Sequence, residues 1–530
     1  MQLWPQLPFP PGDALFLPTE FSFLLPQWNA LFHALQPHID TNSFLQTLAA
    51  RVSWLFFLPF YHRDILKSGG TAVDAAIAGL ICTSVMNPQS SGLGGGVVFT
   101  IYNASTGTVE VINARETVPQ GFHRDFDLLG VTLPFCSSGS QWIAVPGEIR
   151  GYEEAHKRYG RLPWKALFEP TIKLLSEPLV VSLSPELNSS VRTTTFRWPA
   201  LQQTLRAVAE NGATEFYEGQ IGQALVEDLK KAGSVLSMED LKAYKAEVSS
   251  ALNITLNNNT TVFSPRPPMG GAVLLFILKI LEGYKFSKAS LATPKVKEET
   301  YHCHCRDLEV QQYVTAATLL SDETARHVRM KINASGDHPL SYYNLWESTY
   351  NHRYKSMGTS HISVLAADGS AVSATSTINY PFGSFVYSNR TGIILNNELA
   401  DFCIVNRSIN PGERPPSAMV PSILISKTGD MLVIGGAGGA RIISATAVIN
   451  KLWFGYDLED AISSPIMHII NGNISFEERF SEDVRNGLLR RGHKAVKDQF
   501  ALNVVQGISK EGKCISAYSD KRKMGKSAGY

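Results

Sequence analysis

The sequence predicts an α/β fold in which strands are packed between helices. The chain has 530 residues, of which 44% are hydrophobic, so it can bury a large core. Residues 71–85 are small and apolar on nearly all sides, which is typical of a buried helix. Residues 362–366 alternate between apolar and polar side chains, which is the period of a strand with one buried face. These features indicate a sheet-based core covered by helices.

The first half of the chain starts its regular structure with that buried helix. A glycine-rich segment at 92–96 leads into a strand at 97–102, and a second strand follows at 109–113. A dinucleotide-binding loop needs the opposite order, with a strand before the glycines and a helix after them, so that alternative is excluded. Three surface helices and one buried helix are then expected, at 152–159, 201–211, 221–232 and 270–281.

The second half is richer in strands. Asp368 and Gly369 predict a tight turn between two strands of a hairpin. The elements expected in order are this hairpin, two further strands, a helix and a closing hairpin, at 362–377, 393–395, 431–434, 440–454 and 504–518.

Gly358 and Thr359 stand at the head of the first hairpin strand. The Thr359 hydroxyl can attack the carbonyl of Gly358, which no side chain shields, and cut the backbone. The released Thr359 then carries a hydroxyl nucleophile and its own α-amine, whose reference pKa of roughly 8 lets it act as a base near neutral pH. The pattern also fits an ordinary hairpin, and the segments downstream decide between the two.

Those downstream segments closely resemble one enzyme family. They are NNELAD at 396–401, PPSAM at 415–419 and GGAGG at 435–439. Together they resemble the small subunit of the γ-glutamyltransferases, or glutathione hydrolases, of the N-terminal-nucleophile hydrolase superfamily. YPFG at 380–383 and PSILI at 421–425 are most similar to the vertebrate branch called γ-glutamyl leukotrienase. The resemblance implies a four-layer αββα sandwich.

The resemblance assigns the residues that carry the reaction. Thr359 is the nucleophile, Thr377 orients its hydroxyl, and the backbone N–H groups of Gly438 and Gly439 form the oxyanion hole. These glycines follow an expected strand and precede an expected helix, so N–H donors and a helix dipole would converge where negative charge develops. A nucleotide-binding loop is a weaker alternative, because Arg441 stands where that motif needs Gly or Ala.

The resemblance also assigns recognition of the γ-glutamyl group. Arg115 matches the arginine that binds the substrate α-carboxylate, and its planar fork of donors suits a bidentate contact. Glu398 and Asp401, aided by Asn379, match the groups that face the α-ammonium. Ser417 matches one of two adjacent serines that bind the carboxylate, and an alanine replaces the second serine.

In the implied reaction, Thr359 attacks the γ-amide of glutathione, or of a glutathione S-conjugate such as leukotriene C4, and forms a γ-glutamyl ester. Water then gives hydrolysis, and an amino acid or dipeptide acceptor gives transpeptidation. Cleavage between Gly358 and Thr359 yields a large and a small fragment that stay together as a heterodimer. An asparaginase-type N-terminal-nucleophile hydrolase is a weaker alternative, because it lacks the segments around 398 and 417.

No metal or organic cofactor is implied. The segment HCHC at 302–305 lacks the second ligand pair that a tetrahedral zinc site needs. Lys plus Arg number 48 and Asp plus Glu number 47, so no nucleic acid or other polyanionic partner is implied. The six cysteines are too few and too scattered for a disulfide scaffold.

Nine Asn-x-Ser/Thr triplets suit a glycoprotein of the secretory pathway. Animal members of the family carry one N-terminal membrane anchor, so the resemblance implies the extracellular face of the plasma membrane. Residues 1–63, however, form an atypical proline-rich segment without a clear anchor helix. Their longest apolar run, 52–61, is interrupted by Pro59, whereas a membrane span needs about 20 apolar residues.

Residues 64–358 resemble the large subunit, and residues 359–530 resemble the small, catalytic subunit. Within the large-subunit region, the stretches 176–197 and 301–332 are shorter than the family pattern. The shortening favours an alternative, namely an uncleaved, catalytically impaired family member or an incomplete gene model.

Overall fold

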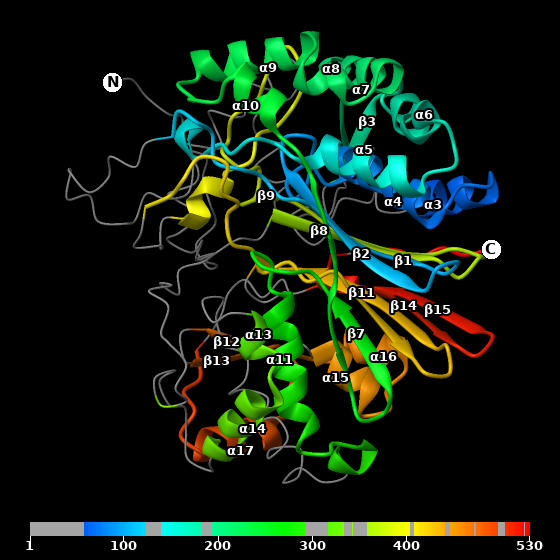
Figure 1. Cartoon of the computed structure of the whole chain (residues 1–530), viewed down its shortest axis with the longest axis vertical. Helices are drawn as coiled ribbons and strands as arrows, with labels where there is room; N and C mark the ends of the chain where they lie inside the picture. The colour runs from blue at the N-terminus through cyan, green and yellow to red at the C-terminus, as the bar shows by residue number, and fades with distance from the viewer. Residues whose placement is uncertain are drawn as a thin grey trace, which may run out of the picture.

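The structure, a computed structural model, describes residues 58–122, 139–182, 193–291, 316–332, 342, 358–402, 408–439, 446–470, 473–496, 504–523 and 525–530. Two antiparallel sheets lie face to face between two layers of helices (Figure 1). The predicted α/β class and its four-layer αββα arrangement are therefore confirmed.

The first sheet has five strands in the order β5-β2-β1-β9-β8. They are β5 (Glu247–Ser250), β2 (Thr108–Ala114), β1 (Gly96–Asn103), β9 (Ala371–Asn379) and β8 (Gly358–Leu365). Strands β8 and β9 form the predicted hairpin, in which Thr359 pairs with Thr377. The register shifts between Gly358 and Thr359, and β8 lies at the edge of the sheet.

The second sheet has six strands in the order β15-β14-β11-β10-β7-β6. They are β15 (Cys514–Ser519), β14 (Val504–Glu511), β11 (Met431–Ala437), β10 (Ser422–Ser426), β7 (Thr260–Ser264) and β6 (Leu252–Thr255). Ala251 alone separates β5 from β6, so the chain passes there from one sheet to the other (Figure 1). Both sheets combine strands from before and after Gly358, which interlocks the two expected fragments.

Helices α3 to α10 cover the outer face of the first sheet (Figure 1). They are α3 (Leu58–Lys67), α4 (Ala72–Met86), α5 (Glu148–Tyr159), α6 (Trp164–Leu174), α7 (Pro199–Asn211), α8 (Thr214–Tyr217), α9 (Gln220–Lys231) and α10 (Met238–Ala243). Every residue of α4 is buried, as its small apolar side chains predict. A capping box between Thr71 and Asp74 fixes where α4 begins.

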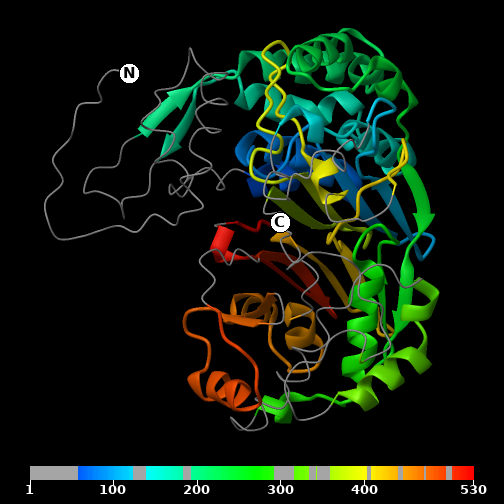
Figure 2. The same ribbon diagram turned by 90° about the vertical axis from the view of Figure 1, so that its left-hand side faces the viewer.

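The other outer layer covers the second sheet. Its central helix is α11 (Gly271–Glu282), which is buried along most of its length. Around it lie α13 (Ala316–Leu319), α14 (Asp322–Lys331), α15 (Thr446–Leu452) and α16 (Leu458–Ser463), with α17 (Glu482–Arg490) beyond them (Figures 1 and 2). Two small hairpins complete the described elements, β3 (Leu179–Ser182) with β4 (Thr193–Phe196) and β12 (Met467–Ile470) with β13 (Asn473–Phe476). The β3–β4 hairpin lies in the stretch 176–197 and projects from the helical layer (Figure 2).

The strand expected at 393–395 is wrong, and two other expectations fall partly or wholly on residues outside the described ranges. Residues 393–395 form no strand, because Ile394 and Leu395 make only isolated bridges, to Tyr387 and Gly94. Of the helix expected at 440–454, the described part begins at Thr446, and residues 440–445 lie outside the described ranges. The HCHC segment at 302–305 also lies outside them.

The two sheets meet tightly behind the head of β8. His361 of β8 is buried, and a Cβ added to Gly435 of β11 would lie 2.3 Å from its ring. Ser373 of β9 donates a hydrogen bond of 2.9 Å to the carbonyl of Ile434. From Ile434 and Gly435, strand β11 therefore runs toward the end of β8 that carries Thr359.

Candidate active site

Thr359 and Thr377 form a hydroxyl pair at the head of the hairpin. Both are buried, and their Oγ1 atoms lie 3.1 Å apart. Thr377 Oγ1 donates to the carbonyl of Gly358 at 2.7 Å. A hydroxyl has a single proton to donate, so Thr359 must be the donor in the pair and Thr377 the acceptor. The nucleophile candidate, its partner and the scissile carbonyl thus lie on one line of hydrogen bonds.

Gly358 is packed too closely for any side chain. A Cβ at this position would lie 2.5 Å from the carbonyl oxygen of Tyr380. The glycine predicted to leave its carbonyl unshielded is therefore also required by the backbone that faces it.

Gly438 and Gly439 directly follow β11, the strand that runs past His361 toward Thr359. Their φ angles are 135° and 64°, a region that favours glycine. This places the two expected oxyanion donors at the same end of the sandwich as the nucleophile. The contribution of a following helix stays a prediction, because residues 440–445 are not described.

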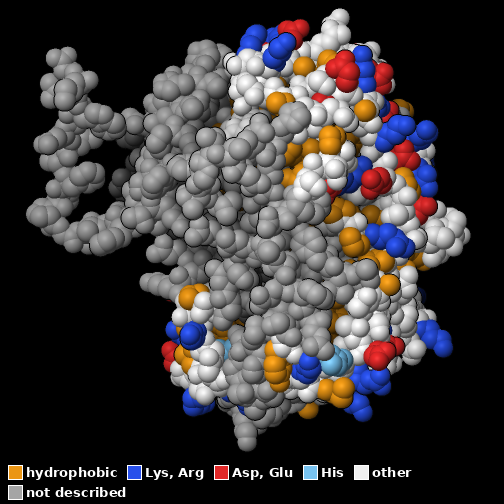
Figure 3. Space-filling view, turned by 60° about the vertical axis from the view of Figure 1, so that its left-hand side comes forward, with side chains coloured by type: hydrophobic (Ala, Val, Ile, Leu, Met, Phe, Trp, Pro, Cys, Tyr) orange, Lys and Arg blue, Asp and Glu red, His pale blue; other side chains and the backbone are white. Residues whose placement is uncertain are grey.

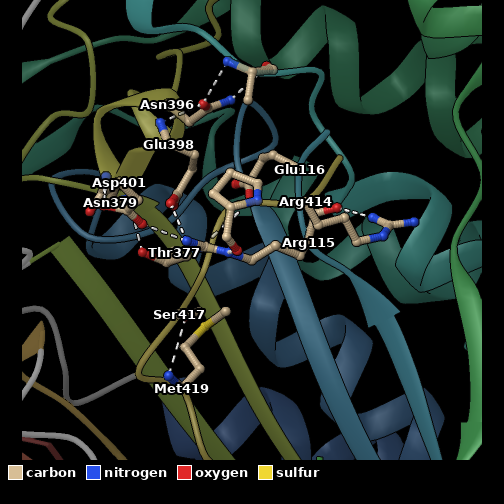
Figure 4. Close-up of polar contacts among 12 residues, drawn as sticks. Arg115, Glu116, Thr377, Asn379, Asn396, Glu398, Asp401, Arg414, Ser417 and Met419 are labelled. Atoms are coloured by element: carbon tan, nitrogen blue, oxygen red, sulfur yellow. Dashed lines mark hydrogen bonds and ion pairs between the residues drawn. The ribbon is translucent and has the colours of Figure 1, made fainter. Parts of the chain in front are cut away.

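Arg115 lies at the end of β2, is 1% exposed, and points into a cluster of carboxylates (Figure 4). Its Nη2 atom lies 2.7 Å from Glu398 Oε2 and 2.7 Å from Asp401 Oδ2. Glu116 Oε2 lies 3.6 Å from Nη1. Glu398 and Asp401 both belong to the short helix η7 (Glu398–Phe402), which is buried throughout. One guanidinium therefore faces three buried carboxylates.

Asn379 connects this cluster to the hydroxyl pair. Its backbone N–H donates to Thr377 Oγ1 at 2.9 Å, and its Nδ2 donates to Asp401 Oδ1 at 2.8 Å. Asn379 has a φ of 75°, a conformation that Asn tolerates better than most residues. A continuous chain of contacts thus runs from Thr359 to Arg115.

The loop before Ser417 closes the other side of the cluster. Arg115 donates from Nε to the carbonyl of Pro415 at 3.2 Å and from Nη2 to that of Pro416 at 2.9 Å. Ser417 itself is buried, and its Oγ accepts from the N–H of Met419 at 3.2 Å. Ser417 therefore lies on the loop that Arg115 holds.

Arg414 and Tyr244 hold that loop against β2 in return. Tyr244 Oη donates to the carbonyl of Arg115 at 2.8 Å, and Arg414 Nη1 donates to the same carbonyl. Arg414 also stacks over the Tyr244 ring at 5.3 Å and pairs with Glu247 at 3.0 Å. The backbone and the side chain of Arg115 are thus both tied to the loop.

Burial dominates the electrostatics of the cluster. Desolvation raises the pKa of Glu398 well above its usual range, although Arg115 opposes the shift. Desolvation likewise raises the pKa of Glu116 to about 7. Arg115 contacts all three carboxylates and Arg414 also acts on Glu116, yet the raised pKa values indicate that part of the cluster holds protons near neutral pH. The site is therefore prepared to accept a further positive charge.

Contacts join six of the expected residues, and Ser417 adjoins them on the loop that Arg115 holds; they are Thr359, Thr377, Asn379, Asp401, Glu398 and Arg115. The roles of Gly438 and Gly439 stay predictions, and the structure adds residues that sequence reasoning missed. Glu116 follows Arg115 directly, and its position in the segment NARET at 113–117 could have identified it as a site residue. Asn396 Oδ1 accepts from the N–H of Glu398 and of Ala144, both at 3.0 Å, which fixes the start of η7 (Figure 4). Arg414 and Tyr244 carried no sequence signal.

The described surface offers no rival charged site on the face in Figure 3. There, Lys and Arg side chains are interspersed with Asp and Glu over the described residues. No group of three or more His, Cys, Asp or Glu side chains in the described ranges could hold a metal ion. Among the described residues, the charged cluster around Arg115 is buried.

Sequence comparisons identify relatives over most of the chain. The family model Gamma-glutamyltranspeptidase matches residues 62–195 and 185–530. The glutathione hydrolase 5 proenzymes of Rattus norvegicus and Homo sapiens are 50% and 46% identical, and each match covers 88% of this chain and 90% of the relative. Scoloptoxin SSD14 of Scolopendra dehaani is 35% identical over 87% of this chain and 89% of its own.

Among solved structures, the cephalosporin acylase from Bacillus halodurans has a similar fold. Its TM-score is 0.75 at 24% identity, and the match covers 88% of this chain and 92% of that one. At that identity, the likeness supports the fold alone.

Proposed function

The chain belongs to the gamma-glutamyltranspeptidase family, and we propose on this premise that it cleaves the γ-glutamyl amide of glutathione and of glutathione S-conjugates through an ester on Thr359. The enzyme class is that of its relatives, glutathione hydrolases made as proenzymes. The observation that carries the assignment of residues is the chain of contacts from Thr359 through Thr377, Asn379 and Asp401 to Arg115.

Self-cleavage comes first. Thr359 Oγ1 attacks the carbonyl carbon of Gly358, and its proton passes to Thr377, whose own proton is already directed at the Gly358 oxygen. The bond from Gly358 C to Thr359 N breaks, the nitrogen takes up a proton, and an ester joins Gly358 to Thr359. Water hydrolyses this ester, which leaves a carboxylate on Gly358 and a free α-amine on Thr359.

Turnover repeats the attack on a substrate. The α-carboxylate of the γ-glutamyl group binds Arg115, and the α-ammonium binds Glu398 and Asp401. The Thr359 α-amine takes the hydroxyl proton during attack on the γ-amide, and the N–H groups of Gly438 and Gly439 hold the oxyanion. The amine product leaves with that proton. Water, an amino acid or a dipeptide then accepts the γ-glutamyl group.

The fragments before and after the cut remain together as a heterodimer in this proposal. Support comes from the sheets, because β1 of the large fragment pairs with β9 of the small one, and β7 of the large fragment pairs with β10 of the small one. Leukotriene C4 is proposed as one S-conjugate substrate on the basis of the sequence resemblance.

We further propose that the protein passes through the secretory pathway to the outer face of the plasma membrane. Four of the triplet asparagines, Asn253, Asn258, Asn259 and Asn389, are exposed, as acceptors of glycans must be. Among the described residues, no helix is both long enough and apolar enough to cross a membrane. A mobility shift on treatment with a glycosidase tests the glycan part of this proposal.

The alternative is a chain that stays uncut and inactive. It is favoured by the break of the family match into two segments near residues 185–195, inside the shortened stretch 176–197. A denaturing gel and intact-mass measurement distinguish the two, because cleavage releases a fragment that begins at Thr359.

The catalytic proposal is tested with wild type, Thr359→Ala and an exposed-threonine control, Thr106→Ala. Wild type and the control should show two fragments and should hydrolyse glutathione and a chromogenic γ-glutamyl anilide. Thr359→Ala should show one chain and no turnover, because the same hydroxyl serves both reactions. Retained hydrolysis in Thr359→Ala would rule out Thr359 as the nucleophile.

A further inference from the structure

A lysine from the opposite end of the small-subunit region reaches the nucleophile residue. Lys523 belongs to the short helix η9 (Lys521–Lys523), which follows β15. Its Nζ donates to the backbone carbonyl of Thr359 at 2.5 Å and lies 3.4 Å from Ser360 Oγ. Because β8 is an edge strand, it has a strand neighbour on one side only. Lys523 supplies the carbonyl of Thr359 with a donor from outside the sheet.

Its neighbour Arg522 fixes the turn that carries Lys523. Arg522 pairs with Glu477 at 2.5 Å and with Asp520 at 3.0 Å, and it donates to the carbonyl of Ser464 at 2.9 Å. Asp520 also accepts from the N–H of Val505 of β14 at 3.3 Å. The turn is thus anchored to the second sheet and to α16, so the approach of Lys523 to Thr359 is built into the fold.

Among the described residues, no carboxylate pairs with the ammonium of Lys523, whose contacts are the Thr359 carbonyl and the Ser360 hydroxyl. On its own side, Asp520 and Glu477 are both engaged by Arg522. On β8 it faces the hydroxyl of Ser360, which accepts from Asn87 at 2.6 Å. His361 follows on the same strand, and burial lowers its pKa to about 3, so it is neutral. Although part of the side chain is exposed, the amine end is enclosed by protein, and desolvation lowers the pKa of Lys523 to about 7.

Cleavage at Gly358 places a second amine beside this one. The new α-amino nitrogen of Thr359 is three covalent bonds from the carbonyl oxygen that Lys523 holds. At about 5 Å and an effective dielectric constant of about 20, two positive charges repel by about 3 kcal/mol. Thr359 is itself buried, so the same desolvation also lowers the pKa of its α-amine, which starts at about 8 against about 10.4 for a lysine. The two amines therefore titrate as a pair at neutral pH, in which Lys523 keeps the proton and the α-amine loses it.

We propose that Lys523 is a positioning residue for the nucleophile, which holds the main chain of Thr359 in place and keeps its α-amine unprotonated as the base. This inference rests on the proposed function, because it needs a cut chain. Three substitutions of Lys523 separate the effect of its charge from the effect of its hydrogen bond. Lys523→Met removes both, Lys523→Gln retains a donor without charge, and Lys523→Arg retains both.

The exposed Lys521 of the same turn provides the matched control, because its side chain pairs with Glu459 and lies over the Tyr518 ring. The pH dependence of kcat for a γ-glutamyl anilide should show an acid limb set by the α-amine. In Lys523→Met and Lys523→Gln this limb should move up by about one to three pH units. In Lys523→Arg and Lys521→Met it should stay near the wild-type position. KM should change little, because the Arg115 cluster is separate.

A second measurement does not depend on turnover. The rate of reductive methylation of the Thr359 α-amine, followed by peptide mass across pH, reports its pKa directly. The same upward shift is expected in Lys523→Met and Lys523→Gln, and thermal unfolding verifies that these variants are folded. Coincident profiles for Lys523→Met and Lys521→Met would overturn the role of Lys523 and leave the proposed function intact. A wild-type chain that is never cut would overturn both.

Discussion

Replacing Arg115 by glutamine should damage both the fold and substrate binding. In the structure the guanidinium is 1% exposed and lies 2.7 Å from Glu398 and 2.7 Å from Asp401, with Glu116 at 3.6 Å. The sequence alone leads us to expect an effect mainly on substrate recognition. The contacts show that Arg115 is also the cation that balances a buried cluster, so its loss leaves negative charges without a partner.

The loss of stability and the loss of substrate binding can both be estimated. Removing one partner of a buried ion pair typically costs about 3–5 kcal/mol, a large share of a total stability of about 5–15 kcal/mol. Glu398 and Glu116 have raised pKa values and can take up protons, so we expect the lower end, about 3 kcal/mol. Loss of the pair with the substrate carboxylate should cost about 2–5 kcal/mol, which is roughly 30-fold to several thousand-fold in KM.

The double variant Arg115→Gln/Asp401→Asn separates the two effects. It removes a carboxylate together with the arginine, so thermal unfolding should recover part of the lost stability while KM stays high. Arg158→Gln is the control, because Arg158 pairs with Glu110 of β2 at the surface. An unchanged KM for glutathione in Arg115→Gln would refute the recognition role. A double variant less stable than Arg115→Gln would refute the charge argument.

Three further outcomes are expected. Thr377→Val should slow self-cleavage about 10²–10³-fold in a time course of intact mass, because it removes the donor to the Gly358 carbonyl; wild-type kinetics would exclude that role. Ala418→Ser should lower KM for γ-glutamyl substrates by about tenfold or more, since a second hydroxyl beside Ser417 adds one hydrogen bond to a charged group, worth about 1.5–3 kcal/mol; unaltered kinetics would show that it does not reach the substrate. Burial raises the pKa of Glu148 to about 8, so the folded state keeps a proton that the unfolded chain releases near pH 4.5. The contribution of this group to the free energy of unfolding is greatest below pH 4.5 and falls by up to about 4–5 kcal/mol as pH rises through 8. The free energy of unfolding of Glu148→Gln, measured in urea, should therefore change less with pH over that range than that of wild type. An equal dependence on pH would contradict the assignment.

The fold was predictable where a pattern is local. Alternation and the Asp368–Gly369 turn predicted the β8–β9 hairpin, and the small apolar residues of α4 predicted its burial on all sides. The expectation for residues 393–395 was wrong because an apolar run of three residues has no period of its own. Those residues are buried in a loop, where Leu395 bridges to Gly94.

The candidate site was predictable through resemblance, and its contacts were not. Arg115 and Asp401 are 286 positions apart in the sequence, and no local rule joins them. Asn379 could be matched to a motif, but its double role depends on the register shift beside Gly358 and on a positive φ. Lys523 and Arg414 carried no motif at all, because their importance arises from where the turn η9 and the loop before Ser417 happen to fold.

The arrangement of charges explains why the site should prefer a zwitterion. Without substrate, Arg115 contacts Glu398 and Asp401, and all three side chains are buried. A ligand with only a carboxylate would take Arg115 from its partners and leave buried negative charge, and one with only an ammonium would leave its own end unpaired. A γ-glutamyl group brings both charges, so the contacts of Arg115 with Glu398 and Asp401 are exchanged for contacts with the substrate. The proton that Glu398 retains is then released as the α-ammonium takes its place. Selectivity for the free γ-glutamyl group thus follows from the cost of leaving any charge in this cluster unmatched.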